Sequence, residues 1–169
     1  MIHIYCGDGK GKTTAAVGLA VRMSGFGGKV LFGQFFKDGS SSEIAPLKQL
    51  PGITVRHCST IPGRYLRLTP EQRIQVSADY TEYLEMLLEM APEYDLLVLD
   101  EVISACNRGT VPEQRLLAFL DRLPEEREVV LTGRNPSEAL QARADYISEV
   151  KKIRHPFDRG IPAREGIEF

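Results

Sequence analysis

Gly7-Asp8-Gly9-Lys10-Gly11-Lys12-Thr13-Thr14 is the stretch that decides the fold, and it lies between an apolar segment and an Ala-rich one. Its three glycines allow a tight turn in which successive backbone N–H groups point inward as an anion nest. The helix expected from Thr13 adds its positive dipole end. Lys12 adds a full charge, and Thr13 offers a hydroxyl to a bound magnesium ion. The stretch therefore predicts a phosphate-binding loop.

The spacing of this loop differs by one residue from the common pattern G-x-x-x-x-G-K-[ST]. Counting back five residues from Gly11 reaches Cys6, so the loop reads G-x-x-x-G-K-T with Lys10 inside it. The alternative is a glycine-rich turn that binds no ligand. The strand expected before the loop, the helix after it and the Lys-Thr pair favour phosphate binding.

Outside the loop, short apolar runs alternate with longer amphipathic ones, which is typical of a parallel sheet with helices on both faces. The expected strands are Ile2–Cys6, Lys29–Phe35, Ile53–His57, Leu96–Asp100, Glu128–Thr132 and Tyr146–Val150. The expected helices are Thr13–Ser24, Pro70–Met90, Pro112–Leu123 and Pro136–Ala144, with Thr69 as the N-cap of the second. The sequence thus predicts an α/β fold: a single P-loop NTPase domain over residues 1–169 with a mostly parallel central sheet. Residues 155–169 are rich in Pro and Gly, and we expect them to form a docked C-terminal arm.

A pair of acidic residues follows one of these strands, in Leu96-Leu97-Val98-Leu99-Asp100-Glu101. Acids at the carboxyl end of a parallel strand face the crevice where such sheets bind ligands. Magnesium prefers hard oxygen ligands of this kind, so Thr13, Asp100 and Glu101 are the candidate metal ligands. The alternative is that Asp100 only caps the next segment. Arg134 and Lys37 also follow strands and are candidates to reach the same crevice.

Composition narrows the class of protein. The 169 residues carry a formal net charge of −2, which argues against a dedicated nucleic-acid binder. Cys6, Cys58 and Cys106 are widely spaced, so they predict reduced thiols rather than a disulfide framework or a zinc site. The sequence has no signal-peptide pattern and no long apolar run. We therefore expect a cytoplasmic protein that does not span a membrane.

The order of several motifs resembles the ATP:corrinoid adenosyltransferases of the bacterial cobalamin pathway. The phosphate loop is followed by Gln34-Phe35 with Lys37, then by Leu99-Asp100-Glu101 and Leu131-Thr132-Gly133-Arg134. Ala144-Asp145-Tyr146-Ile147-Ser148-Glu149 comes next. Last comes the arm from His155 to Phe169, with the specific pattern H-x-F-D-x-G-x-x-A-x-x-G-I-[ED]-[FY]. The matches cover nearly the whole chain, and the shortened loop is also similar to that of the family.

The resemblance implies a definite reaction: transfer of the 5′-deoxyadenosyl group of ATP to the Co(I) of a corrinoid, with release of intact triphosphate. ATP would lie in the loop in the reverse sense to that of ordinary P-loop ATPases. Lys12, Thr13 and Glu101 would be catalytic, with Mg²⁺ as cofactor and the corrinoid as substrate. Arg134 and Lys37 would contact ATP or the corrinoid. A homodimer and a flavoprotein reductase partner are also implied. The full set of expected binding residues is Gly7, Asp8, Gly9, Lys10, Gly11, Lys12, Thr13, Thr14, Lys37, Tyr65 and Arg134.

The chain departs from the family pattern in the loop after the third strand, where family members carry a phenylalanine and a tryptophan. This chain has no tryptophan, and the corresponding stretch runs from Ser59 to Arg67. We expect Tyr65, with Leu66, to supply the apolar face toward the corrinoid. Family members also carry an N-terminal extension that helps to cover the site, whereas the first strand here begins at Ile2.

Two other functions remain open on the sequence. A P-loop kinase or ATPase needs the same loop and acids, but it would release ADP. A non-catalytic carrier of nucleotide or corrinoid would bind its ligand tightly without turnover.

Overall fold

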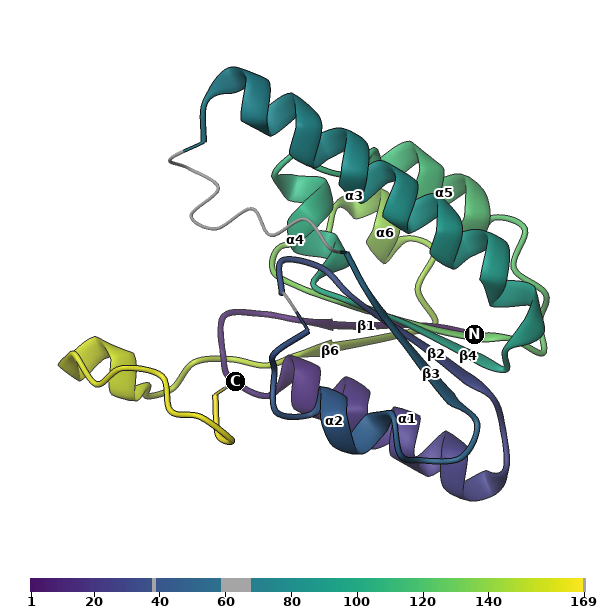
Figure 1. Cartoon of the computed structure of the whole chain (residues 1–169), viewed down its shortest axis with the longest axis horizontal. Helices are drawn as coiled ribbons and strands as arrows, with labels where there is room; N and C mark the ends of the chain where they lie inside the picture. Colours follow the sequence, from purple (N-terminus) through teal and green to yellow (C-terminus); the bar gives the residue numbers. More distant parts are fainter. Residues whose placement is uncertain (38, 59–67, 169) are drawn as a thin grey trace.

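The frame of the molecule is a six-stranded sheet in which all neighbouring strands run parallel (Figure 1). The computed structural model describes residues 1–37, 39–58 and 68–168. The strand order is β3-β2-β4-β5-β1-β6. This arrangement confirms the predicted parallel sheet. The strands are β1 (Ile2–Cys6), β2 (Val30–Gln34), β3 (Ile53–His57), β4 (Leu96–Asp100), β5 (Glu128–Thr132) and β6 (Tyr146–Glu149).

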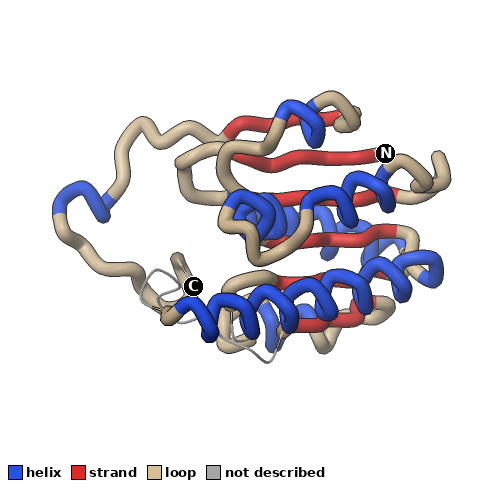
Figure 2. The backbone as a smooth tube through the Cα atoms, turned by 90° about the horizontal axis from the view of Figure 1, so that it is seen from above, coloured by secondary structure: helices blue, strands red, loops and turns tan. Residues whose placement is uncertain are grey.

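Helices cover both faces of this sheet, as the alternation of apolar runs predicts (Figures 1 and 2). One face carries α1 (Lys12–Phe26) and α2 (Ile44–Leu47). The opposite face carries α3 (Pro70–Met90), α4 (Val102–Asn107), α5 (Glu113–Leu120) and α6 (Glu138–Gln141). Among the described residues, the 3₁₀ turn η2 (Ala91–Glu93) follows α3, and the 3₁₀ turn η3 (Pro156–Arg159) lies near the C-terminus.

Two apolar cores form, one on each face of the sheet. Ala16 and Ala20 of α1 pack with Ile44 and Leu47 of α2 against one set of strand residues. The larger core joins side chains of α3 to α6 to the other set. All five residues of β2 and of β4 are buried, which is why these strands show no alternation of polar and apolar residues.

The start of α3 is fixed by local sequence. The Thr69 side chain accepts a hydrogen bond from the Gln72 backbone N–H, and the Thr69 backbone N–H donates one to Gln72 Oε1, while Pro70 occupies the first helical position. This reciprocal pair is a capping box. It confirms the predicted helix start, and the bounds 70–90 agree as well.

Other element bounds differ from the prediction. Helix α1 ends at Phe26 rather than Ser24, because Gly27, not Gly25, takes the left-handed conformation that closes the helix. The helices expected over 112–123 and 136–144 are shorter, as α5 and α6. The prediction lacked α2 and α4, which have four and six residues and are too short to show a periodic pattern.

The chain leaves β6 at one edge of the sheet and continues as the C-terminal arm, whose described part is residues 155–168. The arm extends past the carboxyl ends of the strands and returns toward the start of α1 (Figures 1 and 2). Within the described ranges, no helix is long and apolar enough to cross a membrane.

Candidate functional site

The phosphate loop lies between the end of β1 and the start of α1, and its glycines allow it to pack on the end of β6. A Cβ atom on Gly7 would lie 2.4 Å from the Val150 carbonyl oxygen, and one on Gly9 would lie 2.7 Å from it. The Gly9 N–H donates to that same oxygen over 2.8 Å. Both positions therefore exclude a side chain because backbone lies against them. Gly11 differs: its φ of 121° requires glycine, while the space around it is open.

Asp8 faces away from the loop interior, toward the segment after β6. Its carboxylate accepts a hydrogen bond from the Lys152 backbone N–H over 2.9 Å. That bond holds the pKa of Asp8 below its ordinary value. Asp8 thus joins the loop to the start of the arm.

Lys12 lies at the first position of α1 and is only 8% exposed. Its ammonium donates to the Gly9 carbonyl oxygen over 2.8 Å, so the side chain folds back along the loop. Burial lowers the pKa of Lys12, although the nearby Glu101 carboxylate acts in the opposite direction. The N-cap of α1 is Gly11, which has no side chain to cap the helix, and no acidic residue lies in the first turn. The helix start therefore presents positive charge and N–H dipoles to the loop.

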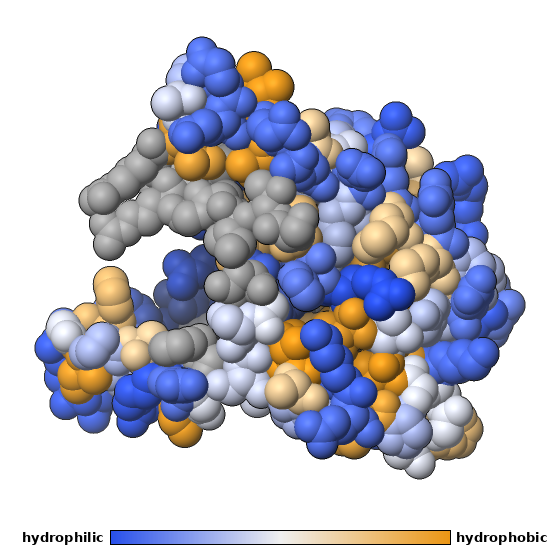
Figure 3. Space-filling model, in the orientation of Figure 1, coloured by the Kyte–Doolittle hydropathy of each residue, from blue (hydrophilic) through white to orange (hydrophobic). Residues whose placement is uncertain are grey.

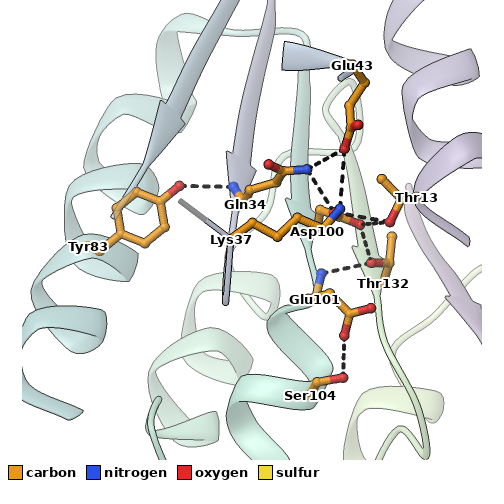
Figure 4. Close-up of polar contacts among 9 residues, drawn as sticks. All are labelled: Thr13, Gln34, Lys37, Glu43, Tyr83, Asp100, Glu101, Ser104 and Thr132. Carbon is orange, nitrogen blue, oxygen red and sulfur yellow. Dashed lines mark hydrogen bonds and ion pairs between the residues drawn. The ribbon is translucent and has the colours of Figure 1, made fainter. Parts of the chain in front are cut away.

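Beneath the loop lies a buried polar network, which we call the Asp100 cluster: Thr13, Gln34, Lys37, Asp100 and Thr132 (Figure 4). Asp100 ends β4, and its side chain is fully buried. Oδ1 accepts bonds from the Thr132 hydroxyl at 2.7 Å and the Thr13 hydroxyl at 2.9 Å. Oδ2 accepts bonds from Gln34 Nε2 and Lys37 Nζ, both at 3.3 Å.

Lys37 neutralises this buried carboxylate. Its ammonium lies 3.3 Å from both Asp100 Oδ2 and Glu43 Oε1. Burial acts to lower the pKa of Lys37, but the two carboxylates outweigh it and hold the pKa above its ordinary value. Lys37 therefore carries its charge at neutral pH, as a buried carboxylate requires.

Glu101 follows Asp100 directly, yet its side chain lies in a different environment. Its φ of 64° is left-handed, which turns the chain from β4 straight into α4. The Glu101 N–H donates to the Thr132 hydroxyl over 2.8 Å, and the Ser104 hydroxyl donates to Glu101 Oε2 over 2.6 Å (Figure 4). The Thr132 hydroxyl thus fixes both acids: it accepts from the Glu101 backbone N–H and donates to the Asp100 carboxylate.

An open cavity of about 270 Å³ lies over the loop, between it and the C-terminal arm. Its loop side comprises Asp8, Gly9, Lys10, Gly11, Lys12, Thr13 and Thr14, joined by Glu101 and Arg134. Its arm side comprises His155, Pro156, Phe157, Ile161, Pro162, Ala163, Ile167 and Glu168. A second hollow of about 320 Å³ lies beside it and contains Lys37 and Glu43. The two share Thr13, Thr14, Ile167 and Glu168.

The residues predicted from the sequence are therefore brought together with few exceptions. The loop from Asp8 to Thr14 meets Glu101 and Arg134 in the cavity over the loop, and Lys37 lies in the adjacent hollow. Gly7 supports the loop from behind. Asp100 does not line either space, because its side chain is fully buried behind Thr13. Tyr65 lies outside the described residues.

Sequence reasoning did not single out Gln34, Glu43, Ser104 and Thr132 for their roles in the network. A signal for two of them was present: Gln34 and Thr132 are polar residues that end otherwise apolar strands. In a parallel sheet those positions share the ligand-binding edge with Asp100.

The oxygen donors around Thr13 fit a magnesium ion. The Thr13 hydroxyl has one proton, which it donates to Asp100, so its lone pairs remain available toward the cavity. Glu101 supplies a carboxylate on the other side. No cluster of three or more His, Cys, Asp or Glu suited to a metal occurs in the described part of the chain. Magnesium does not need one, since it usually binds one or two protein oxygens together with substrate phosphates and water.

Comparison with solved structures supports the fold. The chain superimposes on the EssC protein of Geobacillus thermodenitrificans (ATPases 2 and 3) with a TM-score of 0.54 and 15% identity, covering 99% of this chain and 36% of that one. The type VII secretion ATPase EccC of Thermomonospora curvata gives a TM-score of 0.54 at 17% identity, covering 97% of this chain and 22% of that one. These similarities extend to the fold only.

Comparison of sequences identifies the family. A corrinoid adenosyltransferase of Pseudomonas aeruginosa is 32% identical over 170 residues, which span all of this chain and 83% of the relative. The corrinoid adenosyltransferase CobA of Salmonella typhimurium is 29% identical over 169 residues, which span all of this chain and 85% of the relative. The family model for ATP:corrinoid adenosyltransferase BtuR/CobO/CobP matches residues 1–169. The chain therefore belongs to the ATP:corrinoid adenosyltransferase family BtuR/CobO/CobP, as its ordered motifs predict.

Proposed function

We propose that this chain transfers the adenosyl group of ATP to a corrinoid with the triphosphate held by the loop and by Lys12. The observation that carries the proposal is the meeting of Lys12, Thr13, Glu101 and Arg134 around one cavity. The loop amides and the two cationic side chains suit a polyanion. The Glu101 carboxylate would repel this polyanion, so a cation is needed between the two.

The chemistry requires no protein nucleophile or general base. The Co(I) of the corrinoid donates an electron pair to the 5′-carbon of ATP, and cobalt becomes Co(III) as the cobalt–carbon bond forms. The bond between that carbon and its phosphate oxygen breaks, and its electron pair leaves with the triphosphate. Negative charge therefore grows on the leaving group, where Lys12, the loop N–H groups and Arg134 stabilise it.

Thr13 and Glu101 would hold magnesium, and Asp100 would orient Thr13. Magnesium bound there would neutralise part of the charge on the triphosphate. Asp100 accepts a hydrogen bond from the Thr13 hydroxyl over 2.9 Å and thereby fixes the direction of the hydroxyl lone pairs. Lys37 is already paired with Asp100 and Glu43, so its role is to support that geometry.

The decisive experiment is an anaerobic assay with ATP, Mg²⁺, a cobalamin and a strong chemical reductant. The expected result is a light-sensitive alkylcobalamin spectrum with one triphosphate released per cobalt. Lys12→Ala should lower the rate by on the order of 100-fold or more. Lys48→Ala, at an exposed lysine just after α2, is the matched control and should have no effect. Release of ADP without alkylation would instead place the chain with kinases or ATPases.

The metal assignment has its own test. Glu101→Gln should raise the Mg²⁺ concentration needed for half-maximal rate, while Glu138→Gln at an exposed site should not. An unchanged Mg²⁺ requirement in Glu101→Gln would remove Glu101 from the metal site.

The remaining expectations concern the setting of the reaction. We propose a homodimer in the cytoplasm that accepts an electron from a flavoprotein reductase, because the family resemblance implies these features. Sedimentation analysis would test the homodimer. Reconstitution with a reduced flavoprotein in place of the chemical reductant would test the reductase partner.

A further inference from the structure

The cavity over the phosphate loop has two chemically different sides. The loop side is polar: it presents the cations of Lys10, Lys12 and Arg134 together with the carboxylates of Asp8 and Glu101. The arm side is mostly apolar and is made by Pro156, Phe157, Ile161, Pro162, Ala163 and Ile167. We call these six residues the apolar wall. A ligand that fills the cavity must therefore be charged at one end and apolar at the other.

The apolar wall is exposed to an unusual degree. Phe157 is 75% exposed, Ile167 54% and Ile161 39%. The space-filling view shows apolar surface on the arm where it stands out from the body (Figure 3). Large apolar side chains gathered on one exposed surface mark a binding site more often than single exposed residues do.

Polar contacts nevertheless shape the arm. The His155 ring accepts from the Phe157 N–H over 3.1 Å, and Lys152 pairs with Asp158 over 2.9 Å at the base of the arm. At its tip, Arg164 Nη2 and Glu168 Oε1 pair over 2.9 Å. These bonds give the arm a defined shape although its apolar side chains remain exposed.

We propose that the apolar wall binds the nucleoside part of ATP while the loop holds the triphosphate. The inference rests on the proposed function, since it takes ATP as the ligand. Polarity fixes the direction: Lys10 and Lys12 attract phosphate on the loop side, whereas the arm side is mainly apolar and its carboxylate, Glu168, is already paired with Arg164. A nucleobase is flat and apolar on its faces, so it can stack on Phe157 and the prolines. A cavity of about 270 Å³ also suits part of a nucleotide better than a corrin macrocycle.

The test compares two ligands in the absence of corrinoid: ATP, which has a nucleoside, and inorganic triphosphate, which has none. Isothermal titration calorimetry with Mg²⁺ measures both affinities for the full chain. In a Phe157→Ala/Ile161→Ala variant we expect the Kd for ATP to rise about tenfold, from the usual contribution of base stacking. The Kd for triphosphate should stay unchanged. Lys12→Ala should weaken both ligands.

A matched control lies in the same segment. Ile153 is 92% exposed and does not line the cavity, so Ile153→Ala should leave both affinities unchanged. A thermal melt of each variant checks that the fold is intact, which we expect because the substituted side chains are largely exposed.

Fluorescence gives a second measurement. Since the chain has no tryptophan, Phe157→Trp places a single reporter on the apolar wall. Its emission should change when ATP is added and not when triphosphate is added. Equal responses to both ligands would overturn the proposal, because they would report the phosphate end alone.

The possible failures are distinguishable. If the Phe157→Ala/Ile161→Ala variant binds ATP as tightly as the unaltered chain does, the nucleoside does not lie on the apolar wall, and the proposed function stands. If the unaltered chain binds neither ATP nor triphosphate, the proposed function itself fails.

Discussion

The Asp100 cluster reaches the cavity over the loop through Thr13, and the C-terminal arm forms the other side of that cavity. The two regions reverse the usual distribution of side chains. The cluster is polar and buried: Asp100, Gln34 and Thr132 are 0% exposed. The arm is apolar and exposed, with Phe157 at 75%. The hydrogen bonds on the buried Asp100 carboxylate hold it in one geometry, whereas exposed apolar groups gain stability only when a ligand covers them.

The Asp100 cluster and the arm have different tasks in one site. The cluster orients Thr13 and Glu101 before any ligand arrives, as electrostatic stabilisation of a leaving group requires. The arm gains its apolar contacts from the ligand. Substitutions in the cluster should therefore lower stability, and substitutions in the apolar wall of the arm should mainly lower affinity.

The largest expected effect is that of Asp100→Ala. It leaves the Thr13 and Thr132 hydroxyls without their acceptor and removes one of the two carboxylates that pair with Lys37, and breaking a buried ion pair typically costs about 3–5 kcal/mol. Urea unfolding followed by circular dichroism measures the loss. Asp121→Ala, which breaks an exposed pair with Arg143, is the control and should change stability far less. Equal losses in the two variants would mean that the cluster contributes no more than a surface ion pair.

The next largest loss of stability is expected where the phosphate loop packs on the end of β6. Gly9→Ala would place a Cβ 2.7 Å from the Val150 carbonyl oxygen, and overpacking of this kind typically costs about 1–3 kcal/mol. It should also weaken triphosphate binding, because the loop must shift. In contrast, Gly18→Ala in α1 meets open space and should stabilise the protein by about 0.5–1 kcal/mol. Urea unfolding and calorimetry measure both effects. A stable Gly9→Ala variant with intact triphosphate affinity would contradict the packing argument.

A loss of similar size is expected for Thr132→Val, which removes the hydroxyl that joins Asp100 to the Glu101 N–H. Leaving that N–H unpaired costs about 1–3 kcal/mol. Because Glu101 loses its anchor, the Mg²⁺ requirement should rise, and Thr132→Ser should restore it. A purely structural role would lower stability in Thr132→Val without changing the Mg²⁺ requirement.

The smallest effect on stability concerns the arm. Hydrogen bonds from Arg164 lower the pKa of Glu168 from its ordinary value of 4.5 to about 2. A depressed carboxylate pKa stabilises the folded state above the ordinary value, and that contribution is lost as the pH falls from 4.5 toward 2. The ion pair should thus remain intact from pH 7 to 5. Carboxyl NMR titration of Glu168 measures this, and Arg164→Ala should return the pKa toward 4.5. Titration near 4.5 in the unaltered chain would show that the pair does not form in solution.

Much of the fold could be predicted because its signals are local. The apolar run before Asp100, the glycine loop and the capping box at Thr69 each act over a few residues. The short helices α2 and α4 could not be predicted, since four to six residues carry no periodic pattern. The left-handed turn at Glu101 also has no local signal, because glutamate seldom takes that conformation. The Thr132 hydroxyl, 31 residues away, bonds the N–H of that turn.

The sequence by itself determined the family, the parallel sheet, the phosphate loop and the list of residues near it, because these depend on residue type and order. Only the tertiary structure decided how two adjacent acids differ. Asp100 points into the buried cluster, and Glu101 lines the cavity. The tertiary structure also explains Gly7 and Gly9. A side chain at either position would collide with the backbone of residue 150, more than 140 positions along the chain. Contacts between distant segments arise from the packing of β6 beside β1, which no local pattern specifies.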